Sequence, residues 1–123
     1  MSKLGVVEDT LFVPMAGRIY ASEHYPRILY DEKALDLKKK LPSALLEQDG
    51  QSQYTLLASA ARSANMDRFI MSFLERRPDG IIVQLGCGLE TTYHRCDNGH
   101  TRWYAVDLLH VVAVSYTHLT LPT

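Results

Sequence analysis

The chain has 123 residues and a formal net charge of −1, with 46% of its residues hydrophobic and 22% charged, which is ordinary for one globular domain. The near-neutral charge excludes binding to nucleic acid chiefly through charge, because neutralising phosphates requires a basic excess. No run of 18 apolar residues occurs, so we expect neither a membrane span nor a membrane partner.

Three helices are predicted in the first 77 residues. The first covers residues 9–24, and Pro14 fits only near its first turn. The second follows a capping residue, Asp31, and extends to residue 40, because Pro42 ends it. The third and clearest runs from about residue 53 to 77, where apolar side chains recur at steps of three and four residues.

Two strands are predicted after these helices. Ile81–Leu85 is a short apolar run rich in β-branched residues, which is typical of a buried strand, and it leads directly into the glycine turn Gly86-Cys87-Gly88. The second strand, Arg102–Val106, follows the turn signal Asp97-Asn98-Gly99. Asp107 lies at the carboxyl end of this second strand.

The order of helix, strand, glycine turn, short helix, strand and acid is typical of the opening of a nucleotide-binding α/β domain. In open α/β sheets, ligands bind beyond the carboxyl ends of the strands, which would place Gly86, Gly88 and Asp107 around one crevice. Glycines let the backbone approach a ligand without a Cβ clash. The Asp107 carboxylate could accept hydrogen bonds from the ribose hydroxyls of an adenosine, cap a helix, or do both.

Charge indicates which cofactor such a site prefers. Dinucleotide binders use G-x-G-x-x-G, but the third glycine position here is Thr91. Glu90 would also bring a negative charge to the helix N-terminus where a pyrophosphate binds. S-adenosylmethionine has no phosphate and is favoured over NAD. Two alternatives stay open, namely a non-catalytic nucleotide-binding fragment and an NAD-dependent oxidoreductase fragment.

Two other kinds of site are not expected. Cys87, His94, Cys96 and His100 lie within 14 residues, but they lack the paired spacing of zinc ligands, so we predict no metal. No feature of the sequence marks a base that would make Cys87 a nucleophile.

The N-terminus lacks the apolar core of a signal peptide, and two cysteines in such a chain favour reduced thiols in the cytoplasm.

Several motifs, in order over roughly residues 9–112, resemble the leucine carboxyl methyltransferase-like family of bacterial O-methyltransferases. The segment VQLGCGLET (83–91) resembles the family signature LGCGLDT. RCDNG (95–99) and RWYAVDL (102–108) are similar to its R-x-D-N-G and R-W-Y-x-x-D-L-P stretch. DTLFVP (9–14), ILYD (28–31) and ARSANMDR (61–68) resemble its N-terminal helices and its R-T-x-x-x-D helix. The chain departs from the family pattern at Glu90, Thr92 and Leu109, where Asp, Arg and Pro are usual.

The resemblance implies a role for each candidate residue toward S-adenosylmethionine. Arg62 would hold the carboxylate of the methionine part, which suits its bidentate fork. Gly86, Cys87 and Gly88 would line the methionine and ribose portion, and Asp107 would bind the ribose hydroxyls. Arg18 matches a basic N-terminal position that would also reach the cofactor.

The resemblance also implies fold and reaction. The fold would be α/β, the N-terminal part of a Rossmann-like class I methyltransferase, in which a helical segment (1–50) precedes the truncated start of the cofactor-binding domain (51–113). The methyl acceptor would be a carboxylate or hydroxyl oxygen of a small molecule or a protein C-terminus. No catalytic base is assigned, and the oligomeric state stays open. Residues 114–123 resemble translated sequencing-adapter DNA, so we expect a non-native tail rather than a genuine short strand.

Overall fold

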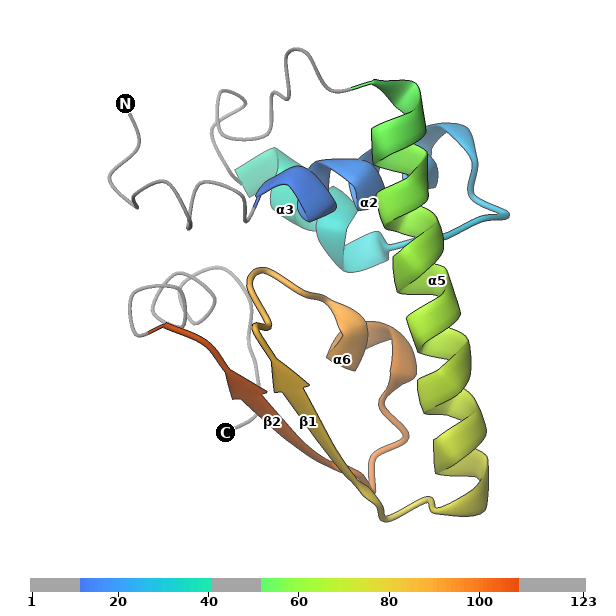
Figure 1. The fold of residues 1–123 in the computed structure, drawn as a ribbon, viewed down its shortest axis with the longest axis vertical. Helices are drawn as coiled ribbons and strands as arrows, with labels where there is room; N and C mark the ends of the chain where they lie inside the picture. The colour runs from blue at the N-terminus through green and yellow to red at the C-terminus, as the bar shows by residue number, and fades with distance from the viewer. Residues whose placement is uncertain (1–11, 41–51, 109–123) are drawn as a thin grey trace. The chain divides into compact units, whose positions relative to one another are not determined.

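The computed structural model describes residues 12–40 and 52–108 (Figure 1). Their elements in chain order are α2 (Phe12–His24), α3 (Glu32–Lys40), α5 (Gln53–Arg76), β1 (Ile81–Leu85), α6 (Thr92–Cys96) and β2 (Arg102–Val106). The chain forms two compact units, Met1–Asn65 and Met66–Thr123, and the division between them falls inside α5. Helices with a parallel pair of strands are compatible with an α/β protein.

Most predicted elements are confirmed within one residue. The helix expected after Asp31 covers Glu32–Lys40, the long helix ends at Arg76 instead of residue 77, and both strands have their predicted bounds. The start of the first helix, Pro42, Leu109 and the expected tail at 114–123 lie outside the described residues. Across the described ranges, no helix has the length and apolar character needed to cross a membrane.

In the first unit, a cap and a close approach explain the local structure. The Asp31 carboxylate accepts a hydrogen bond from the Ala34 amide at 3.1 Å, as a helix N-cap does. Helix α2 approaches the N-terminal part of α5 at Gly17, where an added Cβ would lie 2.8 Å from the carbonyl oxygen of Leu56. The contact therefore requires a residue without a side chain. A small core of Ala21, Leu29 and Ala60 packs beside it.

In the second unit, β1 and β2 pair in parallel and in register, with Ile82 opposite Trp103 and Leu85 opposite Val106 (Figure 1). One face of this sheet is covered, because Leu74 of α5, Cys96 of α6 and Trp103 form one buried cluster. The Trp103 indole N–H donates to the Asp97 carboxylate at 3.0 Å, which satisfies its polar group inside the cluster.

The prediction that β1 is buried is too strong, because the residues on its covered face, Ile82 and Gln84, are half-buried. In the described part of the chain, the other face of the sheet is exposed, with Leu85 at 79% and Val83 at 53%. Alternate residues of a strand point to opposite faces, and here only one face has a helical layer in the described residues. An apolar run therefore identified the strand correctly, but not its surroundings.

Candidate functional site

The glycine turn and Asp107 lie together in the second unit, at the carboxyl ends of β1 and β2. The Gly88 amide donates to the Asp107 carboxylate at 2.7 Å, and the Gly86 amide donates to the carbonyl of Val106 at 2.7 Å. The other oxygen of Asp107 accepts the Leu108 amide, also at 2.7 Å. The arrangement expected from two adjacent parallel strands is thus present, and the carboxylate directly contacts the turn.

The backbone of the turn requires glycine. Gly86 and Gly88 have φ values of +63° and +52°, in the left-handed region that side chains with a Cβ rarely adopt. A Cβ added at Gly86 would meet no atom within 4 Å, so this side of the turn is open to an approaching group. Both properties suit a turn that receives a ligand against its backbone.

Cys87 lies between these glycines and is buried. Burial raises the pKa of its thiol, and the negative charges of Asp107 and Glu90 raise the pKa further. A thiol in such surroundings stays protonated at neutral pH and is a poor nucleophile.

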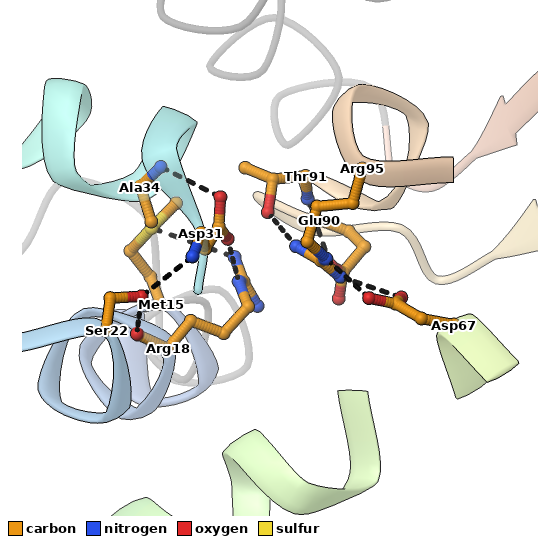
Figure 2. A network of polar contacts seen from close by, with 9 residues as sticks. All are labelled: Met15, Arg18, Ser22, Asp31, Ala34, Asp67, Glu90, Thr91 and Arg95. Carbon is orange, nitrogen blue, oxygen red and sulfur yellow. Dashed lines mark hydrogen bonds and ion pairs between the residues drawn. The ribbon is translucent and has the colours of Figure 1, made fainter. Parts of the chain in front are cut away.

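Arg95 of α6 connects the end of the glycine turn to α5 (Figure 2). Its guanidinium holds the Asp67 carboxylate with two bonds, from Nε at 2.7 Å and from Nη2 at 3.1 Å. Nη2 also donates to Glu90 at 3.1 Å, and Nη1 donates to the Thr91 hydroxyl. Because Thr91 is four residues before Arg95, one helical turn places the two side chains side by side. The Arg95 and Asp67 side chains are only 9% and 11% exposed.

This network changes the electrostatic interpretation of Glu90. From the sequence, Glu90 was expected to bring a negative charge to the N-terminus of the short helix. In the structure its carboxylate accepts bonds from the Arg95 guanidinium and the Thr91 amide, so Arg95 offsets part of the charge. The same guanidinium also pairs with Asp67, so a net negative charge remains, and the charge argument against a pyrophosphate is weaker but not removed. The steric argument stands, because Thr91 is fully buried at the third glycine position of dinucleotide binders.

Arg18 is buried in the first unit, 1% exposed, and its Nε donates to the Asp31 carboxylate at 3.1 Å (Figure 2). Its Nη2 contacts the Met15 sulfur at 3.7 Å. The Ser22 hydroxyl completes the network, since it donates to the Arg18 carbonyl and accepts the Asp31 amide. A cofactor contact by Arg18 would have to share its guanidinium with this ion pair.

Arg62 also belongs to the first unit, on α5, and its side chain is exposed. An exposed guanidinium can take a carboxylate ligand without breaking an internal ion pair. The structure therefore brings together Gly86, Cys87, Gly88 and Asp107 in one unit, while Arg18 and Arg62 are described in the other.

Sequence reasoning did not identify Asp67 and Arg95 as parts of the site. A signal was present for Asp67, because it lies seven residues from both Ala60 and Leu74, on the buried face of α5. An acid at such a position needs a buried cationic partner. No comparable pattern marks Arg95, whose partner is 28 residues away along the chain.

Metal ligation has no support in the residues that the structure describes, where no group of three or more His, Cys, Asp or Glu side chains could hold an ion. Comparison of the chain with protein-family models, with curated proteins and with solved structures finds no match. The resemblance to the methyltransferase family therefore stays a prediction from the motifs themselves.

Proposed function

We propose that this chain binds S-adenosylmethionine and belongs to an O-methyltransferase of Rossmann-like class I fold, acting in the cytoplasm. One observation carries the proposal: the Asp107 carboxylate lies 2.7 Å from the Gly88 amide, where two parallel strands end. An acid beside a glycine turn at this place in the fold suits an adenosine, whose ribose hydroxyls need acceptors. The ordered motifs between residues 9 and 112 support the same assignment.

The residues present fit this cofactor chemically. Each carboxylate oxygen has two lone pairs, and the backbone bonds from Gly88 and Leu108 leave acceptor capacity for hydroxyl donors. The open side of Gly86 gives a ligand access to the backbone of the turn. Arg62 is exposed, so its guanidinium can take a carboxylate, and the resemblance assigns it the amino-acid carboxylate of the cofactor.

The bound cofactor supplies an electrophilic methyl group, so the protein forms no covalent intermediate. The task of the chain is to hold the methyl donor in one orientation and to exclude water during in-line transfer. The acceptor would be a carboxylate or a hydroxyl oxygen of a small molecule or of a protein C-terminus. A carboxylate acceptor needs no base, whereas a hydroxyl acceptor would need one, and no residue is assigned that role.

Calorimetric titration with S-adenosylhomocysteine tests the proposal on the full chain. Asp107→Ala should weaken binding about ten-fold or more, because it removes a charged acceptor from the ligand. Arg62→Ala should weaken binding by a similar factor. The matched control is Asp79→Ala, since exposed Asp79 lies in the loop before β1, at the opposite end of the same sheet.

The outcomes separate the candidate functions. Binding that is lost with Asp107→Ala and kept with Asp79→Ala supports the methyl-donor site. A folded chain that binds NAD but not S-adenosylhomocysteine would make it a dehydrogenase fragment instead. A folded chain that binds neither compound would reject the proposed function.

A further inference from the structure

The glycine turn is held from two sides by different groups. On the strand side, backbone and carboxylate acceptors of β2 and its end bind the amides of Gly86 and Gly88. On the helix side, the turn closes through the Glu90 amide, which donates to the Cys87 carbonyl at 2.9 Å. On the same side, the Arg95 guanidinium donates hydrogen bonds to the side chains of Glu90 and Thr91.

We propose that Arg95 is a positioning residue for this turn: by holding Glu90 and Thr91 against Asp67 of α5, it keeps Gly86–Gly88 in the conformation that receives the cofactor. The inference rests on the proposed function for the identity of the ligand. The effect of Arg95 on the order of the turn concerns the ligand-free protein and can be measured without any ligand.

The geometry requires an arginine for this task. A planar guanidinium offers five N–H donors in a fixed fork, and here they reach three side chains at once. Two of these, Asp67 and Glu90, are carboxylates, so the cation also offsets their mutual repulsion. A lysine keeps one positive charge, but a single ammonium cannot hold Asp67 through two parallel bonds and also reach Glu90 and Thr91.

The consequence for the cofactor is preorganisation. Two left-handed glycines permit many backbone conformations in the absence of restraint, and ordering them at the moment of binding would weaken affinity. A turn that is already fixed by Arg95 avoids this loss. Arg95 would therefore influence affinity through the turn and not through its own contact with the ligand.

The test compares Arg95→Lys with two controls in the full chain. Arg102→Lys is the same substitution at an exposed arginine of β2 in the same unit. Leu74→Val weakens the core cluster beside α6 without removing a bond of the Arg95 network. Amide hydrogen exchange of Gly86, Cys87 and Gly88 is measured without ligand, and S-adenosylhomocysteine affinity is measured by calorimetry.

With Arg95→Lys, we expect exchange at the three turn amides to accelerate about ten-fold or more, while amides inside β1 and β2 change little. Affinity for S-adenosylhomocysteine should fall by about the same factor. Both quantities should stay unchanged with Arg102→Lys. With Leu74→Val, exchange should accelerate across the whole unit and not selectively at the turn.

Two results would overturn the inference. One is an Arg95→Lys protein whose turn exchanges as slowly as the wild type. The other is acceleration spread evenly over the unit, as with Leu74→Val, because that would mean a general loss of stability. If the wild type fails to bind S-adenosylhomocysteine, the proposed function fails, and the exchange measurement still decides the role of Arg95.

A second variant covers the case in which Arg95→Lys does not fold. Glu90→Leu keeps the bidentate pair between Arg95 and Asp67 and removes the acceptor through which Arg95 holds Glu90. Selective acceleration at Gly86–Gly88 in this variant supports the inference. Unchanged exchange in a folded Glu90→Leu protein contradicts it.

Discussion

Substitution Asp31→Asn isolates the charge of a buried ion pair. Asp31 is fully buried, and its carboxylate accepts both the Arg18 guanidinium and the Ala34 amide at 3.1 Å. Asparagine caps a helix about as well as aspartate, so the bond to Ala34 is retained. Removing one charge of a buried pair costs about 3–5 kcal/mol, because the other charge stays in a poorly solvated site. We expect a loss near the lower bound, about 3 kcal/mol, since asparagine still accepts one hydrogen bond.

A short series of variants divides this loss into its parts. Asp31→Ala should cost about 1 kcal/mol more than Asp31→Asn, because the cap is lost as well. The double variant Arg18→Met with Asp31→Asn should recover most of the lost stability, because it removes both charges and leaves no unpaired charge in the interior. Urea unfolding followed by the helical circular dichroism signal gives each free energy of unfolding.

Two results would contradict a buried ion pair between Arg18 and Asp31. If Asp31→Asn lowers the free energy of unfolding by less than about 1 kcal/mol, the ion pair behaves as a solvent-exposed pair and is not buried as the structure shows. Arg18→Met alone completes the cycle: if its loss and the loss of Asp31→Asn simply add in the double variant, Arg18 and Asp31 do not interact. The only tryptophan, Trp103, lies in the other unit, so its fluorescence reports whether a loss spreads there.

Three further measurements address the turn, the thiols and the sheet. Gly86→Ala should lower the free energy of unfolding by about 1 kcal/mol through its positive φ alone, since no atom blocks the new methyl group; thermal unfolding checks this. Burial raises the pKa of the Cys96 thiol to about 12. The contribution of this thiol to the free energy of unfolding should therefore be full below pH 9 and should decline as pH rises toward 12. In urea unfolding, the free energy of unfolding of Cys96→Ala should decline less steeply over this pH range. Leu85→Gln should change stability by less than about 0.5 kcal/mol at its exposed position, whereas Trp103→Ala should cost about 3–5 kcal/mol in the same denaturation assay.

Local signals in the sequence were sufficient for the elements and for the meeting of the turn with Asp107. Helix periodicity, the Asp31 cap and the β-branched run at Ile81–Leu85 each act over a few residues, and the observed bounds follow them closely. The contact between Gly88 and Asp107 spans 19 residues, yet it was predictable, because parallel strands align their carboxyl ends whatever lies between them.

The ion pairs could not be predicted in the same way. Arg18 and Asp31 are 13 residues apart, and Asp67 and Arg95 are 28 apart, with no strand pairing that fixes their relative position. Their meeting depends on how helices pack, which sequence spacing does not determine. The surroundings of β1 were missed for a related reason, since an apolar run indicates a strand but not how many of its faces are covered.

The two supports of the glycine turn differ in what a ligand would do to them. Ribose hydroxyls would use the remaining lone pairs of the Asp107 carboxylate, so the ligand contact lies on the strand side of the turn, beside the Gly88 amide. The Arg95 bonds to Glu90 and Thr91 are made to side chains on the helix side, and a ligand on Asp107 has no need to break them. A turn whose support lies apart from its ligand contacts keeps its shape while those contacts exchange. This separation is the reason why a short, glycine-rich segment would need a largely buried arginine side chain beside it.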